Sequence, residues 1–316
     1  MALDSGLNAM VTKTELDEVL DTSYSEPDTR WGFAHAFTTD LFKQENLAEG
    51  NAFLMAEHMG PGLFESTGEN EEPTEASPRT ANKMTIEIVD YTKDLPISKD
   101  FNVDDKHGVV QQDVRRMGQK AKTTQDKYAF DTCYAGGFDA TLTPDAAYLW
   151  SDSHTNLNGD TIDNLATGAL TPDNLEVLIR KLYEQKDQSG DLGGHGAAAL
   201  LVPPALMKKA LAYTESELEP NVADNNRNYI SIRFDSIRVY ENPYVGGTFN
   251  DYSNANTAYY LVSPEHKLTR KIRQALSTVM VPWQFDKKRR WMYRVDYRET
   301  YYAGTWEGAV ASTGTV

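Results

Sequence analysis

Residues 104–135, DDKHGVVQQDVRRMGQKAKTTQDKYAFDTCYA, carry the longest helical pattern in this chain of 316 residues. Apolar side chains recur at helical spacing along one face, at Val110, Val114, Met117, Ala121 and Tyr128. No proline interrupts the stretch, Asp104 and Asp105 stand at its start, and Gly136 and Gly137 follow its end. At 1.5 Å per residue this helix would be roughly 45 Å long. Such a length predicts a helix that braces an elongated molecule.

A hairpin-like segment, residues 51–98, precedes this helix. Residues 52–58 are apolar and predict a strand, and the sequence MGPG at 59–62 ends it. A polar tip follows, after which residues 83–98 (KMTIEIVDYTKDLPIS) alternate as a half-exposed strand does. The tip has too few apolar side chains to pack a core. It is therefore either a disordered surface loop or an arm that becomes ordered on another subunit.

The first thirty residues predict an arm. It should contain one short helix, with Leu16 and Leu20 on its apolar face and Thr14 as its cap. Residues 32–51 indicate a second short amphipathic piece.

The region after the long helix predicts an α/β layer. Residues 171–190 fit a helix with Thr171 as cap and Pro172 in the first turn. Its buried face should consist of Leu175, Leu178, Ile179 and Leu182. Residues 197–215 (AAALLVPPALMKKALAYTE) then fit a buried strand, a Pro-Pro break and a short helix.

The remaining segments alternate in the manner of strands, with one exception. Residues 229–243 and 257–266 alternate, and residues 289–310 place Trp291, Tyr293, Val295 and Tyr297 on one face. Residues 268–283 (LTRKIRQALSTVMVPW) are ambiguous, and their first half fits a helix better than a strand.

Charge is distributed unevenly along the chain, whose net charge is −16. Residues 1–30 have a net charge of −5, and residues 61–82 have −4. Residues 266–294 have a net charge of +8. The candidate contact residues are five loop glutamates (Glu65, Glu69, Glu71, Glu72, Glu75) and seven basic residues (Arg270, Lys271, Arg273, Lys287, Lys288, Arg289, Arg290). The acidic total disfavours a simple sequence-reading DNA binder, which is usually basic.

The usual signatures of catalysis and metal binding are missing from the sequence. A single cysteine excludes a disulfide framework, and the six histidines are far apart. The glycine-rich residues 190–196 lack the phosphate-loop spacing, and residues 154–160 lack the acidic residue that ends a calcium loop. Cys133 fits a small core residue better than a nucleophile. We therefore expect no enzyme activity, no cofactor and no metal. The lack of an apolar run near 18 residues predicts no membrane span.

The order of these parts resembles the major capsid protein of tailed double-stranded DNA phages, which has the HK97-like fold. Several stretches are also similar to phage head proteins. They are residues 134–147 (YAGGFDATLTPDAA), 168–182 (GALTPDNLEVLIRKL), 199–211 (ALLVPPALMKKAL) and the aromatic closing strand. The resemblance implies an α+β fold with an N-terminal arm (1–50) and an extended loop, or E-loop (51–98). A peripheral domain with the spine helix (99–165), an α/β axial domain (166–284) and a return strand of the peripheral domain (285–316) would follow.

The resemblance also implies a function. The subunit would self-assemble as pentamers and hexamers into an icosahedral phage head that encloses packaged double-stranded DNA. Its partners would be other copies, a separate scaffold protein, a portal, a decoration protein in some heads, and DNA in non-specific contact. Its place would be the virion, after assembly in the host cytoplasm. Encapsulin compartments share this fold and remain an alternative. An α/β enzyme without a recognisable motif is an alternative of another class.

Two further expectations concern contacts between subunits. Some members of the family crosslink their shells through a lysine on the extended loop, but residues 51–82 contain no lysine. We therefore predict no isopeptide crosslink. The acidic arm and loop tip are expected to lie across the basic segments of neighbours, where many weak ion pairs set register and partner choice.

Overall fold

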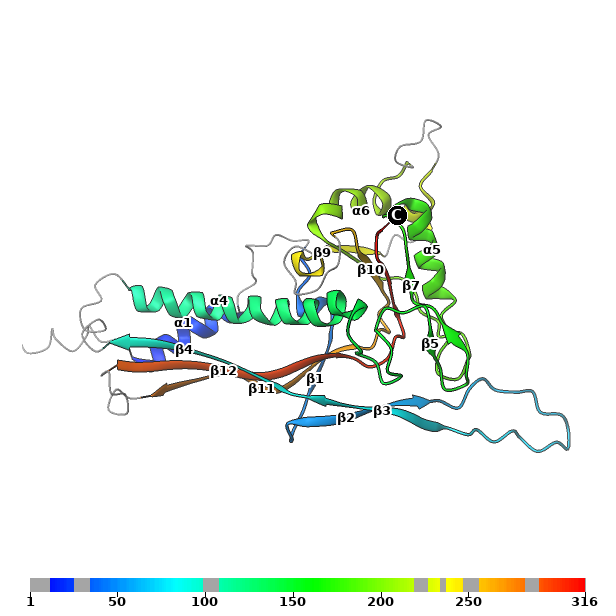
Figure 1. The fold of residues 1–316 in the computed structure, drawn as a ribbon, viewed down its shortest axis with the longest axis horizontal. Helices are drawn as coiled ribbons and strands as arrows, with labels where there is room; N and C mark the ends of the chain where they lie inside the picture. The colour runs from blue at the N-terminus through cyan, green and yellow to red at the C-terminus, as the bar shows by residue number, and fades with distance from the viewer. Residues whose placement is uncertain are drawn as a thin grey trace, which may run out of the picture.

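The computed structural model describes residues 12–25, 35–98, 108–218, 227–233, 237–246, 256–281 and 290–315. The molecule is elongated (Figure 1), and the α+β class is confirmed. The long helix α4 (Val109–Ala129) lies along one sheet, a layered unit stands at its C-terminal end, and a hairpin projects beyond that unit. Within the described ranges, no helix combines the length and the apolar content that crossing a membrane requires.

The spine helix begins later than expected. Gly108 adopts a left-handed φ of 65°, so α4 starts at Val109 rather than at residue 104. Asp104 and Asp105 lie outside the described residues. The helix continues as a π-helical segment, η2 (Phe130–Ala135), and a 3-10 turn, η3 (Gly136–Phe138). The 21 residues of α4 and the 6 of η2 span roughly 40 Å, so the brace is confirmed at slightly reduced length.

The buried face of α4 agrees with the expected stripe at three of five positions. Val110, Val114 and Ala121 are buried. Gly118 occupies the centre of the stripe, and Met117 is only partly buried beside it. Tyr128 is 39% exposed, so its assignment to the buried face was wrong. Its ring packs instead on Tyr91, with centroids 5.1 Å apart.

Helix α1 (Lys13–Ser25) packs across the spine helix. Leu16 and Leu20 are buried, as expected. The cap is Thr12 rather than Thr14, because Thr12 Oγ1 accepts the Glu15 N–H at 3.4 Å. Glu15 in turn accepts the Thr12 N–H at 2.9 Å, which completes a capping box. The short helix α2 (Thr38–Leu41) follows further along the chain.

A four-stranded sheet lies under the spine helix in the order β1-β11-β12-β4. Its strands are β1 (Lys43–Asn46), β4 (Val89–Ser98), β11 (Leu268–Val281) and β12 (Arg290–Ala303). The helix expected in the first half of 268–283 is wrong, because β11 pairs on both sides and this pairing outweighs local helix propensity. The alternation of β12 is confirmed, with Trp291, Tyr293, Val295 and Tyr297 buried.

The extended loop is a two-stranded hairpin with a long tip. Strand β2 (Ala52–Met59) pairs with β3 (Arg79–Glu87) in antiparallel fashion. The returning strand expected at 83–98 is divided at Ile88, where the chain leaves the hairpin and enters β4 of the main sheet. The hairpin is thus continuous with the sheet under the spine helix (Figure 1).

The layered unit is built on a five-stranded sheet in the order β7-β13-β10-β8-β9. Its strands are β7 (Leu165–Ala166), β8 (Ala199–Val202), β9 (Arg238–Glu241), β10 (Tyr259–Val262) and β13 (Ala309–Ser312). Helices α5 (Pro172–Tyr183) and α6 (Met207–Thr214) pack on it, with short turns η4 (Pro204–Leu206) and η5 (Pro243–Val245). A small hairpin, β5 (His154–Thr155) and β6 (Thr161–Ile162), lies beside it.

Local signals located the elements of this unit well, although helix α5 ends at Tyr183 rather than at residue 190, and one segment adopts another structure. The Thr171 hydroxyl caps α5 by accepting the Asn174 N–H at 3.2 Å, and the four leucine and isoleucine side chains of the expected face are buried. The segment expected as a strand from residue 229 begins instead as helix α7 (Tyr229–Arg233). Strand β11 lies in the sheet of the spine helix and β13 in the five-stranded sheet, so a boundary at residue 284 does not follow the sheets.

An aromatic core joins the two sheets where the spine helix ends. Tyr134 packs on Phe130, Phe42 and Tyr260, with ring centroids 5.2–5.7 Å apart. The indole of Trp150 donates a 2.8 Å hydrogen bond to the Tyr134 carbonyl. Cys133 is fully buried in the same cluster, as expected of a core residue. The two halves of the molecule are therefore connected through packed side chains as well as through the chain.

Candidate inter-subunit surfaces

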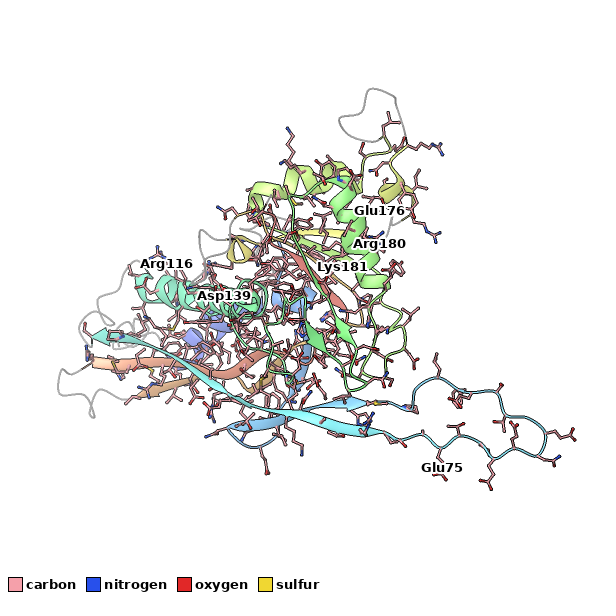
Figure 2. All side chains as sticks on the ribbon, turned by 45° about the vertical axis from the view of Figure 1, so that its right-hand side comes forward. Glu75, Arg116, Asp139, Glu176, Arg180 and Lys181 are labelled. Carbon is pink, nitrogen blue, oxygen red and sulfur yellow. The ribbon has the colours of Figure 1, made fainter. Side chains whose placement is uncertain are left out.

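The tip of the extended loop is a charged surface without a core. Every residue from 61 to 80 is exposed, including the five candidate glutamates Glu65, Glu69, Glu71, Glu72 and Glu75. Two local contacts shape the tip: Thr74 donates to Glu65 at 2.7 Å, and the Gly68 N–H donates to Glu71 at 2.9 Å. Figure 2 shows Glu75 on the loop, away from the body. This geometry leaves the acidic side chains accessible to another molecule.

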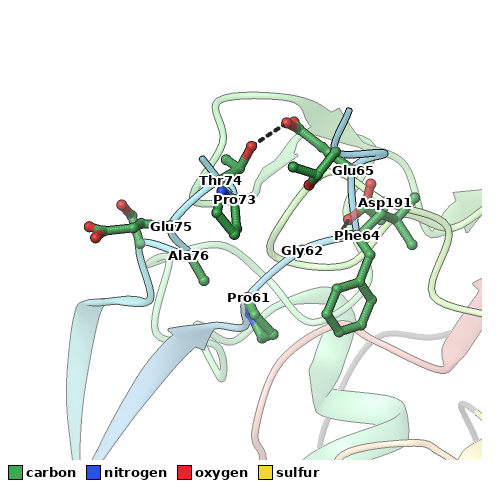
Figure 3. A pocket seen from close by; sticks show the side chains of 12 residues that line it. Pro61, Gly62, Phe64, Glu65, Pro73, Thr74, Glu75, Ala76 and Asp191 are labelled. Carbon is green, nitrogen blue, oxygen red and sulfur yellow. Dashed lines mark hydrogen bonds between the residues drawn. The ribbon is translucent and has the colours of Figure 1, made fainter. Parts of the chain in front are cut away.

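The base of the tip adds apolar area to this charge. The two branches of the loop and Asp191 line a groove of about 490 Å³ (Figure 3). The Leu63 N–H donates a 3.1 Å hydrogen bond to Asp191 Oδ2, which connects the loop to the body. Leu63 is 77% exposed and Phe64 102% exposed. Exposed apolar side chains bordered by charge are typical of a protein–protein contact.

Arg270, the first candidate basic residue, is used inside its own subunit. Its Nε and Nη2 donate to Glu299 Oε2 at 2.9 and 2.6 Å, and both side chains are buried. Burial alone would lower the pKa of Arg270, but the adjacent Glu299 reverses this and raises it. The Tyr301 hydroxyl also donates to Glu299, at 2.5 Å. This placement argues against the inter-subunit role expected for Arg270.

The next two candidates fasten the N-terminal segment to β11. Lys271 Nζ lies 2.9 Å from Glu45 Oε2 and 4.4 Å from the centroid of the Phe53 ring. Arg273 Nη1 donates to the Ala48 carbonyl at 2.6 Å. Both side chains therefore have partners in their own chain.

The remaining candidates fall at the start of β12. Lys287, Lys288 and Arg289 lie outside the described residues. Arg290 begins β12 opposite Ser98. The pairing of these basic residues with a neighbour stays a prediction.

The acidic arm shows the same internal use of charge. Asp17 of α1 accepts hydrogen bonds from the Thr278 and Tyr293 hydroxyls, both at 2.7 Å, and forms an ion pair with Lys13. Burial raises the pKa of Asp17, but these hydrogen bonds together with Lys13 produce a net lowering. Much of the arm, residues 1–11 and 26–34, lies outside the described residues.

One charged residue of the hairpin was not identified from the sequence. Glu57 lies in the apolar strand β2 and is 1% exposed, and burial raises its pKa to about 7. Asn82 donates to its Oε2 at 2.7 Å. The sequence offered one signal for a buried acid, namely a single carboxylate within the apolar stretch AFLMAEHM. An acid in such a strand either faces solvent or is buried with hydrogen-bond partners.

The sites that could hold chemistry have structural roles. Burial raises the pKa of the Cys133 thiol, so the nucleophilic thiolate is disfavoured. In the polar turn after β5, the Asn156 side chain accepts the Asp160 N–H at 2.7 Å, as turn residues do. The glycine-rich segment bridges back to Lys186 through Leu192. In the part of the chain that the structure describes, no three His, Cys, Asp or Glu side chains gather as metal ligands would.

Comparison with known proteins agrees with this fold. The family model of phage capsid proteins matches residues 81–312. The capsid of the native GTA particle is 15% identical, with a TM-score of 0.58 over 92% of this chain and 95% of that one. The capsid of cyanophage P-SCSP1u is 11% identical, with a TM-score of 0.59 over 91% and 90%. The holo-SrpI encapsulin complex of Synechococcus elongatus is 10% identical, with a TM-score of 0.55 over 92% and 90%. No curated protein matches the sequence.

The class of protein follows from three features: the spine helix over its sheet, the projecting hairpin and the layered unit. Together they form the HK97-like capsid fold, so the expected α+β architecture is confirmed. Because the family model matches most of the sequence, the chain belongs to the phage capsid protein family. It is a structural subunit that forms a multi-subunit shell, and its place is the capsid of the virion. The expected resemblance to a phage major capsid protein is thereby confirmed.

Proposed function

We propose that this subunit forms pentamers and hexamers of an icosahedral phage head that encloses packaged double-stranded DNA. The observation that supports this most directly is the family match over residues 81–312, which includes the spine helix, the five-stranded sheet and three of the four strands of the other sheet. The subunit acts structurally and catalyses no reaction. It assembles in the host cytoplasm, without a membrane, on a separate scaffold protein and around a portal. A decoration protein binds the outside in some heads.

Within this proposal the chain is divided by its sheets. The four-stranded sheet with α4 forms the peripheral domain, the five-stranded sheet with α5 and α6 forms the axial domain, and residues 52–87 form the extended loop. We propose that the acidic tip of this loop lies on a neighbouring subunit, with Leu63 and Phe64 supplying apolar contact. From the sequence we expect the receiving surface to include Lys287, Lys288 and Arg289, whereas Arg270 is excluded because Glu299 already pairs its charge.

Reversing the loop charge tests this contact. The variant Glu69→Lys, Glu71→Lys, Glu72→Lys, Glu75→Lys should abolish or misdirect shell assembly, because like charges would then face each other between subunits. The monomer should keep its stability, since these side chains are exposed. Sedimentation and negative-stain microscopy of co-expressed subunit and scaffold measure assembly, and chemical denaturation measures stability.

The matched control replaces the same four glutamates with glutamine, which removes charge without reversing it. We expect this control to assemble with reduced efficiency. Normal particles from the lysine variant would contradict the proposed contact. Particles filled with protein cargo instead of DNA would favour the encapsulin alternative.

A further inference from the structure

The base of the extended hairpin contains a buried carboxylate with an incomplete set of partners. Glu57 is 1% exposed, whereas none of residues 58–80 is buried. Its Oε2 accepts a 2.7 Å hydrogen bond from Asn82, but its buried Oε1 has no hydrogen-bond partner among the residues that the structure describes. The register of β2 against β3 also shifts between Ala56 and Glu57. Glu57 therefore marks the point at which the hairpin leaves the body.

The charges of the body that act on Glu57 are already paired among themselves. His154 Nδ1 lies 2.7 Å from Asp145 Oδ2, and its ring stacks on Trp306. Lys267 Nζ lies 3.8 Å from Glu307 Oε2. The His154 imidazole and the Lys267 amine thus contact Asp145 and Glu307, and no ion pair to Glu57 forms among the described residues, so an ionised Glu57 adds a third carboxylate without a direct ion-pair partner. An unpaired buried charge is strongly unfavourable.

We propose that Glu57 is a proton-dependent latch, which holds the hairpin on the body when it is protonated and releases the hairpin when it is ionised. The carboxylic acid can donate a proton from the oxygen that lacks a partner, and it removes the repulsion from Asp145 and Glu307. The ionised form regains favourable hydration only if the base of the hairpin moves into water. The latch is a property of the single subunit and does not rest on the proposed function.

The direction of the pH dependence follows from the pKa of Glu57. Burial raises this pKa from 4.5 to about 7, with Asp145 and Glu307 adding to the rise and Asn82 and His154 opposing it. The docked hairpin therefore binds more protons than the released one. Docking is fully favourable below pH 4.5 and weakens as the pH rises through about 7. The full difference between the two pKa values corresponds to an opening constant about 300-fold larger at high pH.

Hydrogen–deuterium exchange of the full chain tests the latch. Exchange of peptides that span 52–59 and 79–87 is measured from pH 5.5 to 8.5 and corrected for the intrinsic pH dependence of amide exchange. In the unchanged protein, hairpin opening should increase on the order of 10- to 100-fold over this range, with a midpoint near pH 7. The variant Glu57→Gln should show no such increase. Glu75→Gln, the same change at an exposed loop position, should behave as the unchanged protein does.

A second variant keeps the proposal falsifiable if Glu57→Gln folds poorly. Glu307→Gln removes one of the two facing carboxylates and should shift the opening midpoint to lower pH, because Glu57 then ionises more easily. A flat pH profile in the unchanged protein would overturn the latch. A Glu57→Gln variant that retains the pH-dependent opening would also overturn it, since another group would then be responsible.

Discussion

Arg270 and Glu299 form a buried ion pair on adjacent strands of the sheet under the spine helix. Their side chains are 8% and 2% exposed, and Gln125 of α4 reaches the same carboxylate at 3.5 Å. Removal of one partner leaves an uncompensated buried charge. Glu299→Gln should therefore destabilise the subunit by about 3–5 kcal/mol, measured as the free energy of unfolding in urea.

Two comparisons separate this effect from a general loss of charge. Arg294→Met breaks an exposed pair with Asp94 on the same sheet and should cost less than about 1 kcal/mol. The double variant Arg270→Met, Glu299→Leu replaces the whole pair with apolar groups and should recover much of the stability. A Glu299→Gln variant as stable as Arg294→Met would show that the buried pair is not important for folding.

Asp126 predicts a pH dependence of folding. This carboxylate of α4 accepts the Thr38 N–H at 3.0 Å, and burial raises its pKa to about 7 despite that bond and nearby Lys122. The native state therefore binds more protons than the unfolded chain, and stability is lost as the pH rises through about 7. Between pH 5.5 and 8.5, the free energy of unfolding should fall by about 2 kcal/mol less in Asp126→Asn than in the unchanged protein.

Urea unfolding of the unchanged protein and of Asp126→Asn at the two pH values measures this difference. Glu57 contributes equally to the pH dependence of both proteins, so its effect cancels. Asp139→Asn, an exposed change near the end of the spine, is the control and should leave the pH profile unaltered. If Asp126→Asn also has no effect, the carboxylate is not protonated in the folded protein.

At the scale of elements, the contact between α1 and the spine helix depends on a glycine. A Cβ on Gly118 would lie 2.2 Å from Ser23 Oγ and 3.0 Å from the Leu20 carbonyl oxygen. Gly118→Ala should therefore destabilise the subunit by about 1–3 kcal/mol through overpacking, even though alanine favours helix. Chemical denaturation measures the loss, and exchange of α1 amides locates it.

Adding Ser23→Ala to this variant removes the closest contact and should restore part of the stability. Gly60→Ala is the control, because no atom of the described residues lies within 4 Å of the added Cβ. A Gly118→Ala variant more stable than the unchanged protein would mean that helix propensity outweighs packing at this site.

The elements also differ in how much local sequence could predict. Helix α5 carries its own cap, first-turn proline and apolar face, so its sequence and its structure agree. The first half of strand β11, by contrast, fits a helix better than a strand in its local sequence. It becomes a strand because β1 and β12 both pair with it, and neither pairing is visible in a local window.

At the scale of the whole molecule, the extended loop bears on covalent linkage between subunits, because some members of the family crosslink their shells through a lysine on this loop. Lys83 is the first lysine of the hairpin, and it lies on β3 opposite Ala56, below the tip. We predict that assembled shells boiled in denaturant run as a single band of 35.4 kDa, because the tip has no lysine to form an isopeptide bond. A ladder of covalent oligomers on the gel would contradict this prediction.

The candidate contact surface illustrates the limit of reasoning from charge along the chain. The acidic tip could be located from the sequence, because its glutamates stand among turn residues with few apolar neighbours. The pairing of the three bases on β11 could not be predicted from the sequence. Their partners, Glu299, Glu45 and the Ala48 carbonyl, approach Arg270, Lys271 and Arg273 only in the folded sheet. Charge along the sequence therefore identified the accessible acids but overestimated the accessible bases.

Local sequence was sufficient to predict the order of parts, the α+β class, the long spine helix, the buried face of β12 and the exposed acidic loop. These features depend on periodicity, capping and composition, which act over a few residues. The division of the hairpin at Ile88, the strand at 268–281 and the burial of Glu57 became visible only in the folded structure. These depend on pairing and burial between segments far apart in the chain, where the free energy of a contact is set by its neighbours in space.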